Sequence, residues 1–253
     1  MLLVDFFNFL SQYAIIDWIV NILLLVPAYI LKYTTFGENF TPFITSDIDN
    51  PISTNSLTYG ILCIVIFGVG SLIVILLWLL IYYDVNVIKA TASYIFSIAS
   101  AMLVCAAIGK IVGRPRPDTI AICGGDGSYL TCTGFLDQKQ LASQFSSFPA
   151  TEAAEAMAAA IFLCLYIGEL IPYYNNVTSL LMASPIFFAI FVVAACIWDR
   201  RNHIDDAVCA MIIGAVMGLI SFHTFKKVIK QKKIELRPAA VTETSSLPMP
   251  RYN

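Results

Sequence analysis

Charged side chains are scarce in this sequence, because Asp, Glu, Lys and Arg together make up 13% of its 253 residues. That is about half the share of an ordinary soluble domain. Hydrophobic residues reach 58% and the mean hydropathy is +0.78, so the composition predicts an integral membrane protein. The net charge of −2 gives no reason to expect nucleic-acid binding, and no segment has the composition of a separate soluble domain.

Targeting and cofactor signals are also missing. The N-terminus lacks a basic n-region and a small-residue cleavage site, so we expect the first hydrophobic helix to act as the targeting signal. Of the two histidines, His203 lies near the polar motifs described below, and His223 is interpreted as a packing residue. We expect neither a metal nor a cofactor.

The hydrophobic residues fall into six segments of roughly 20 residues, the length that crosses a hydrocarbon core of about 30 Å. We therefore predict an all-α fold, a polytopic bundle of six transmembrane helices, with Pro149 in the first turn of the fourth. Gly214 and Gly218 have GxxxG spacing, a weak motif because small residues in any tight bundle explain it equally well. The spans are expected at about 13–31, 58–83, 87–112, 149–171, 177–198 and 204–225.

A lysine-rich segment, KKVIKQKK (226–233), follows the last span, and juxtamembrane lysine is strongly biased to the cytoplasmic side. Six spans then place both termini in the cytoplasm of an endomembrane or plasma-membrane protein. The predicted parts are a cytoplasmic N-terminus at 1–12, a membrane domain at 13–225 with lumenal loops at about 32–57, 113–148 and 199–203, and a basic, then flexible, tail at 226–253.

Two modifications are expected in the lumenal loops. Asn39 begins the sequon Asn-Phe-Thr in the first loop and is expected to be open to glycosylation, whereas Asn176 in a cytoplasmic loop is not. Cys123 and Cys132 lie nine residues apart in the second lumenal loop, where an oxidising compartment favours a disulfide. The alternative, a zinc site, needs more ligands than this loop offers.

The second lumenal loop begins with the segment GRPRP (113–117), in which Arg114 and Arg116 alternate with two prolines. Proline cannot continue a helix and holds its preceding residue near extended geometry. Two guanidinium groups are thus presented on a stiff segment at the mouth of the bundle, which suits an anion. An ordinary polar loop with arginines at the membrane edge explains GRPRP equally well.

The order of motifs resembles the membrane-bound lipid phosphate phosphatases of the type 2 phosphatidic acid phosphatase (PAP2) superfamily. That order is GRPRPD (113–118), a cysteine-bearing loop, SFP (147–149) opening a helix, and a polar cluster before Asp206 on the last helix. The likeness covers roughly 110–218 through motifs and the whole chain through its six spans. The family pattern has three parts: Lys, six residues, Arg-Pro; then Pro-Ser-Gly-His; then Ser-Arg, five residues, His, three residues, Asp.

The resemblance implies a phosphoryl-transfer site. In the family, the histidine of the third part attacks phosphorus and the Asp orients its imidazole. The histidine of the second part protonates the departing alkoxide, and Lys, Arg and backbone amides neutralise the phosphoryl oxygens. Such a site must be net positive, because its ligand and its transition state are anionic.

The first two parts of the pattern are only partly present. Arg116-Pro117 match the first part, but Lys110 is separated from Arg116 by five residues instead of six, and Gly109 holds the lysine position. One residue on a helix is a rotation of about 100°, so Lys110 is not guaranteed to face the site. In the second part Pro149 is kept, while Glu152 replaces the histidine.

The third part has also lost its nucleophile. Alignment on the retained Asp206 puts Cys196 at the arginine position and Asn202 at the position of the attacking histidine. A shift by one residue would use His203 instead, but it places Ala207 and Ile197 at the Asp and Arg positions, so neither register restores the set.

The charges near these motifs are nearly balanced, with five basic and six acidic side chains. We expect Glu152 to replace phosphate as the partner of Arg116 or Arg114, and Asp206 or Asp199 to engage Arg200 or Arg201. The sequence therefore favours a charge-compensated cluster over an anion site. The basic residues are Lys110, Arg114, Arg116, Arg200 and Arg201, and the acidic ones are Asp118, Glu152, Glu155, Asp199, Asp205 and Asp206.

Two functions follow from the resemblance and its departures. The first is a catalytically inactive lipid phosphatase-like protein that acts as a lipid-binding protein, a scaffold or a subunit of a membrane complex. The alternative is an active lipid phosphate phosphatase that uses His203 as nucleophile and Glu152 as acid. The expected partners are membrane lipids, with a second copy of the chain or other membrane-protein subunits compatible with either function.

Overall fold

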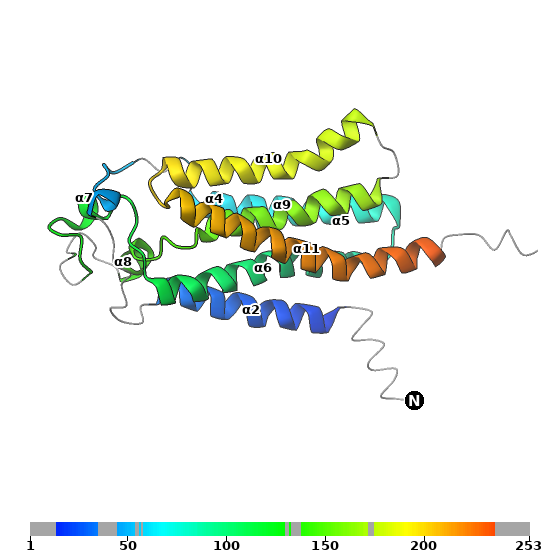
Figure 1. The fold of residues 1–253 in the computed structure, drawn as a ribbon. Helices are drawn as coiled ribbons and strands as arrows, with labels where there is room; N and C mark the ends of the chain where they lie inside the picture. Colours follow the sequence, from blue (N-terminus) through cyan, green and yellow to red (C-terminus); the bar gives the residue numbers. More distant parts are fainter. Residues whose placement is uncertain are drawn as a thin grey trace, which may run out of the picture.

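The computed structural model describes residues 14–34, 45–53, 56, 58–129, 132, 138–171 and 175–235, and it confirms an all-helical bundle (Figure 1). Within these residues, six helical spans are long and apolar enough to cross a membrane. Three short helices, α3 (Thr45–Ile48), α7 (Thr119–Cys123) and α8 (Gln138–Gln144), belong to the connections. The spans are α2 (Ile15–Tyr33), the continuous unit α4 (Tyr59–Cys63), η1 (Ile64–Val69) and α5 (Gly70–Ile81), then α6 (Val87–Val112), α9 (Thr151–Leu170), α10 (Asn176–Trp198) and α11 (Ile204–Glu235).

Three expected helix limits are wrong. Helix α2 continues through Lys32 to Tyr33, so this lysine belongs to a span and not to the first loop. Helix α9 begins at Thr151 with Ala150 as its N-cap, which leaves Pro149 outside the first turn. Helix α11 runs on to Glu235, ten residues beyond the expected end of the last span, because the whole lysine-rich segment continues the helix. Lysine has a good helix propensity and interacts favourably with the C-terminal end of the helix dipole.

Helix α9 is the central element of the bundle, and α6, α10 and α11 pack against it. Its alanines allow this close approach, since small residues let membrane helices pack backbone to backbone. The GxxxG pair of α11 serves the same contact, with Gly214 against the Ala154 carbonyl and Gly218 against the Ala158 carbonyl. The motif therefore packs two helices of one chain together.

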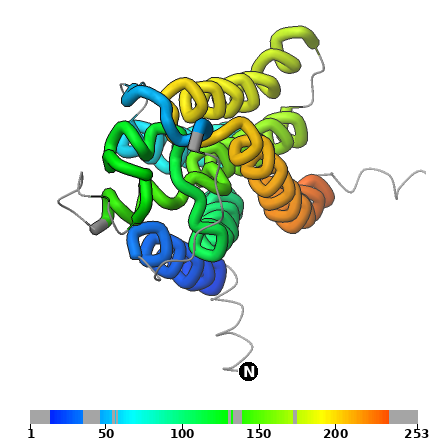
Figure 2. Tube along the Cα trace, turned by 60° about the vertical axis from the view of Figure 1, so that its left-hand side comes forward, coloured from blue at the N-terminus to red at the C-terminus, as the bar shows by residue number. Residues whose placement is uncertain are grey.

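Helices α2 and α10 lie on opposite sides of the bundle, as both ribbon and tube views show (Figures 1 and 2). Helix α2 packs mainly on α6, where the buried Asn21 amide donates to the Ala92 carbonyl at 2.9 Å. Asp17, one turn earlier in the same helix, is exposed. Asn21 and Ala28 are the buried residues of α2, so most of this helix faces outward.

The second span contains a π-helical turn, which the sequence did not predict. The Tyr94 hydroxyl donates to the Ile66 carbonyl at 2.7 Å, and this carbonyl lies inside η1. A π turn frees backbone groups from the regular ladder, and the tyrosine satisfies one of them in an apolar environment. Gly70 makes room for the ring, because a Cβ there would lie 2.0 Å from the Tyr94 hydroxyl oxygen.

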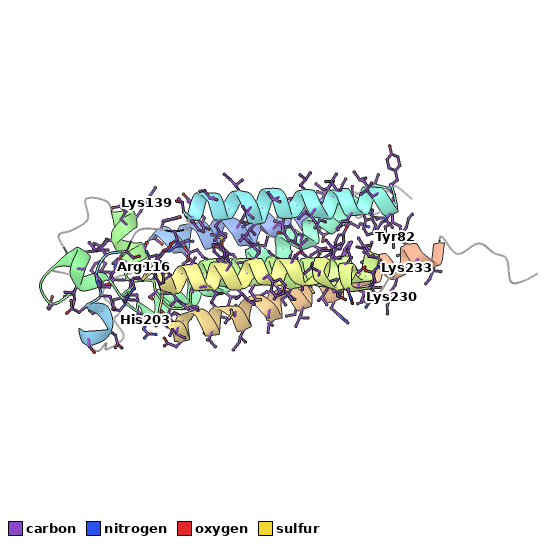
Figure 3. The ribbon with its side chains drawn as sticks, turned by 90° about the horizontal axis from the view of Figure 1, so that it is seen from above. Tyr82, Arg116, Lys139, His203, Lys230 and Lys233 are labelled. Atoms are coloured by element: carbon purple, nitrogen blue, oxygen red, sulfur yellow. A yellow bond between two sulfur atoms is a disulfide. The ribbon has the colours of Figure 1, made fainter. Side chains whose placement is uncertain are left out.

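The two ends of the bundle differ in chemistry (Figure 3). One end, here called the motif end, holds Arg116, His203, α7 and α8. The opposite end, here called the lysine end, holds the last turns of α11. There Lys226 and Lys233 bind Glu169 of α9, and Lys232 binds Asp84 at 2.8 Å in the turn before α6. These pairs fix the extended part of α11 to the rest of the bundle.

Candidate phosphate-binding site

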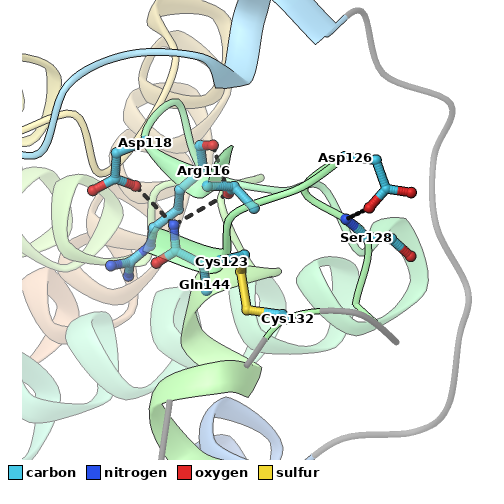
Figure 4. Close-up of a disulfide and its surroundings, with 8 residues drawn as sticks. Arg116, Asp118, Cys123, Asp126, Ser128, Cys132 and Gln144 are labelled. Atoms are coloured by element: carbon cyan, nitrogen blue, oxygen red, sulfur yellow. Dashed lines mark hydrogen bonds between the residues drawn. A yellow bond between two sulfur atoms is a disulfide. The ribbon is translucent and has the colours of Figure 1, made fainter. Parts of the chain in front are cut away.

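The segment between α6 and α9 contains the expected disulfide, Cys123–Cys132 (Figure 4). Cys123 ends α7, which directly follows the GRPRP segment. The buried Gln144 amide of α8 donates to Asp118 at 2.7 Å and to the Thr119 hydroxyl at 3.1 Å. The disulfide and the Gln144 hydrogen bonds therefore connect α7 and α8 to each other beside the arginine-bearing segment.

The proline-flanked segment is extended, and its two arginines diverge. Its backbone pairs with the chain before α9, because the Arg116 amide donates to Gln144 and the Ser147 amide donates to the Arg114 carbonyl. Residues two apart in a regular strand share a side, but these two side chains do not. Arg114 reaches α11, where it binds Asp205 at 2.5 Å and Asp206 at 2.6 Å, whereas Arg116 lines a cavity between the helices.

This cavity, here called the cation cavity, has a volume of about 290 Å³ at the motif end. Four basic side chains line it, and Glu152 is its single acidic lining residue. The lining residues are therefore mainly cationic, although Asp199, which is not among them, pairs with Arg201. Its lining residues are Lys32, Tyr33, Thr58, Tyr59, Cys105, Ala106, Gly109, Lys110, Arg116, Ser143, Ser146, Pro149, Thr151, Glu152 and Arg201.

Glu152 has a different partner from the one expected. Its carboxylate lies 3.6 Å from the Lys32 ammonium, and neither Arg114 nor Arg116 forms an ion pair with it among the described residues. The expectation failed because the sequence placed Lys32 in a loop, whereas the last turn of α2 carries it to the first turn of α9. Glu155, one turn further along α9, is fully buried and accepts a hydrogen bond from Tyr59 at 3.3 Å.

The two arginines of the GRPRP segment have opposite electrostatic environments. Burial lowers the pKa of the Arg116 guanidinium below its usual value, and the charges of Glu152 and Asp118 offset this only in part. Burial acts in the same direction on Arg114, but its bonds to Asp205 and Asp206 raise the pKa of that guanidinium above its usual value. The Arg116 Nε is buried and has no hydrogen-bond partner among the described residues, which suits a site for an anion.

Arg201, like Lys32, is a cation of the cavity that the sequence did not assign to the phosphate site. The turn between α10 and α11 folds back so that the Arg201 amide donates to the Cys196 carbonyl at 3.1 Å. Its side chain binds Asp199 at 3.2 Å, which confirms one expected pair, and also lines the cavity. Cys196 holds the arginine position of the family pattern. Arg201, five residues later in the sequence, supplies a guanidinium to the cavity instead.

Asp206 organises the turn at the start of α11. This buried carboxylate accepts hydrogen bonds from the Ser147 hydroxyl at 2.5 Å and from the His203 amide at 2.9 Å, and its Oδ2 lies 3.0 Å from His203 Nδ1. Its other oxygen binds Arg114, and not the expected Arg200 or Arg201. Arg200 bonds to Asn50 instead.

The two residues nearest the family's nucleophile position do not line the cation cavity. The Asn202 amide donates to the Ser147 carbonyl at 2.5 Å. His203 Nε2 is buried and has no hydrogen-bond partner among the described residues. Both residues border a separate outer cavity of about 1070 Å³, together with Arg114, Arg200 and Asp205.

The remaining site residues divide between the cavity and its edge. Lys110 lines the cavity and its ammonium lies 3.4 Å from the Ser146 hydroxyl, despite its shifted position in the motif. Pro149 also lines the cavity, whereas Pro117 borders the outer one. Asn39 lies outside the described residues. A lone lysine at the end of the first span is the signal that could have indicated Lys32.

Comparison with known proteins gives one consistent answer. A family model described as "PAP2 superfamily" matches residues 90–230. Lipid phosphate phosphatase 2 of Arabidopsis thaliana is 25% identical over 232 residues, covering 85% of this chain and 78% of that protein. Phospholipid phosphatase 1 of Mus musculus is 22% identical, covering 82% of each chain, and the probable diacylglycerol pyrophosphate phosphatase 1 of Schizosaccharomyces pombe is 24% identical, covering 86% and 81%. No solved structure matches the chain.

Proposed function

From the premise that this chain belongs to the PAP2 superfamily, we propose that it binds a phosphate-bearing membrane lipid and does not hydrolyse it. The family and the six apolar helices make it an integral, multi-pass membrane protein. The relatives named above are lipid phosphatases, which supports a membrane lipid as the ligand. Lipid binding would allow the protein to act as a scaffold or as a subunit of a membrane complex.

One observation carries the proposal: four cations line the cavity and no histidine is among its lining residues. A phosphate ester is held by charge-assisted hydrogen bonds from Lys and Arg, which the cavity supplies. Hydrolysis through a phosphoenzyme also requires a nucleophile in reach of phosphorus. Asn202 cannot act as one, because its amide nitrogen has no available lone pair and already donates to the Ser147 carbonyl.

A second candidate, an altered lipid phosphatase, has one observation in its favour. His203 Nδ1 lies 3.0 Å from Asp206 Oδ2, an arrangement that orients an imidazole for attack through its other nitrogen. That other nitrogen is buried and does not line the cation cavity. Attack by His203 therefore requires the turn between α10 and α11 to rearrange.

The orientation proposed from the sequence is supported by two independent features. The juxtamembrane lysines gather at the lysine end, and the disulfide closes a loop at the motif end. Lysine favours the cytoplasmic side and disulfides favour an oxidising compartment. We therefore place both termini in the cytoplasm and the motif end on the lumenal or exterior side.

The test uses the purified full chain in detergent micelles with phosphatidic acid carrying a radiolabelled phosphate. We expect retention of labelled lipid by the protein without release of inorganic phosphate, while an active lipid phosphate phosphatase assayed in parallel releases it. Turnover that is abolished by His203→Ala would overturn the proposal in favour of the second candidate. Absence of lipid retention would overturn the proposed binding.

A further inference from the structure

The first span contributes Lys32 and Tyr33 to the lining of the cation cavity, and the ammonium of Lys32 is buried. Its side chain is 15% exposed and its Nζ makes no hydrogen bond to a described residue. The nearest carboxylate oxygen, on Glu152, is 3.6 Å away, which is an ion pair but too long for a hydrogen bond. Three N–H donors are thus held in a cavity with other cations, and none of them is satisfied by a hydrogen bond to a described residue.

The ring of Tyr59 also contacts this ammonium. The Lys32 Nζ lies 3.5 Å from the centroid of the Tyr59 ring, within the range of a cation–π contact. The Tyr59 hydroxyl is anchored to the buried Glu155. The ammonium is therefore positioned by two helices other than its own, α4 and α9.

We propose that Lys32 is a direct ligand of the lipid phosphate group and that Glu152 is its competing counter-ion in the ligand-free cavity; this rests on the proposed function. The family pattern places a lysine at the position of Gly109, and Gly109 lines the same cavity. A Cβ at this glycine would already lie 3.2 Å from the Phe148 carbonyl oxygen. The first span supplies an ammonium from another direction.

Charge explains the role of Glu152. A phosphomonoester carries about two negative charges at neutral pH. Glu152 and Asp199 pair with two of the four cavity cations, so about two positive charges remain to match it. The ligand must compete with Glu152 for Lys32, and the carboxylate repels it. Removal of the Glu152 charge should therefore strengthen phosphate binding, whereas removal of the Lys32 charge should weaken it.

The experiment measures binding of dioleoyl phosphatidic acid to the purified full chain in nanodiscs. Lys32→Met keeps the length and volume of the side chain and should weaken binding about tenfold or more, the effect of one lost charge-assisted hydrogen bond. Lys32→Arg should restore most of the affinity. Lys230→Met is the matched control, because this exposed lysine lies at the lysine end (Figure 3) and should leave binding unchanged.

Glu152→Gln should strengthen binding several-fold, and Lys32→Met should remove most of that gain. A second arm uses inorganic phosphate as competitor: displacement of the lipid at millimolar phosphate supports recognition of the phosphate group itself, and no displacement at any concentration contradicts it. Thermal denaturation of each variant shows whether it is folded, and the comparison uses the neutral variant Lys32→Gln if Lys32→Met is not.

Two failures are distinguishable. If the wild-type chain binds phosphatidic acid and a folded Lys32→Met binds equally well, the role of Lys32 is refuted while the proposed function stands. If the wild-type chain does not bind the lipid, the proposed function itself is refuted. Equal weakening by Lys32→Met and Lys230→Met would mean a general charge effect and would also refute a ligand role for Lys32.

Discussion

Gly214 of α11 lies directly against the Ala154 carbonyl of α9, so close that a Cβ at this glycine would be 2.3 Å from the oxygen. We predict that Gly214→Ala destabilises the protein by about 1–3 kcal/mol, because the added methyl group must push the two helices apart. Thermal denaturation in detergent measures this.

Gly60→Ala is the control for this prediction, since a Cβ at Gly60 meets no atom within 4 Å. Alanine there should be neutral or slightly stabilising, because alanine has a higher helix propensity than glycine. Equal stability of the two variants would contradict the close contact.

Asp205 and Asp206 bind the same Arg114 side chain but differ in burial. The Asp206 side chain is fully buried. Its removal takes away the acceptor of the Ser147 hydroxyl and the buried one of the two carboxylates at Arg114, which should cost about 3–5 kcal/mol. The Asp205 side chain is 67% exposed, and its removal should cost less than about 1 kcal/mol. Denaturation of Asp206→Ala and Asp205→Ala measures the difference, and similar losses would contradict this network.

Restoring the two histidines of the family pattern should not restore a phosphatase. The double variant Glu152→His with Asn202→His places one imidazole in the cation cavity, but position 202 faces the Ser147 carbonyl and does not line that cavity. We expect no strong release of phosphate from labelled phosphatidic acid. Robust turnover would show that the turn between α10 and α11 rearranges readily and would contradict this prediction.

The Cys123–Cys132 disulfide should stabilise the motif end. Replacing both cysteines with serine should lower the free energy of unfolding by about 2–3 kcal/mol, the effect of closing a loop of this length. Mass spectrometry of protein never exposed to reductant checks the bond directly, and two alkylated thiols would exclude it.

Glycosylation tests the proposed orientation of the chain in the membrane. A glycan is expected on Asn39 and not on Asn176, where α10 begins at the lysine end. Pro42 directly follows the first sequon and lowers its occupancy, so the decisive observation is the second site. A glycan on Asn176 would reverse the proposed topology.

Composition and hydrophobic segment length were sufficient to predict the six-helix bundle, because any chain in a hydrocarbon environment must satisfy its backbone within helices of membrane-spanning length. The disulfide could also be predicted, since both cysteines lie in one short glycine-rich loop. The altered motif positions at Glu152 and Asn202 are visible in the sequence alone.

The electrostatic character of the site was decided by tertiary structure. A count of charges near the motifs gave near balance, but the bundle separates them: Asp206 turns toward Arg114, while Lys32, Lys110, Arg116 and Arg201 line one cavity. Lys32 is 120 residues from Glu152 in sequence, and only the packing of α2 at the motif end brings the two within 3.6 Å. The energy of a Coulomb interaction depends on the distance between the charges and on their burial. For residues on different helices, the spacing along the chain gives neither quantity.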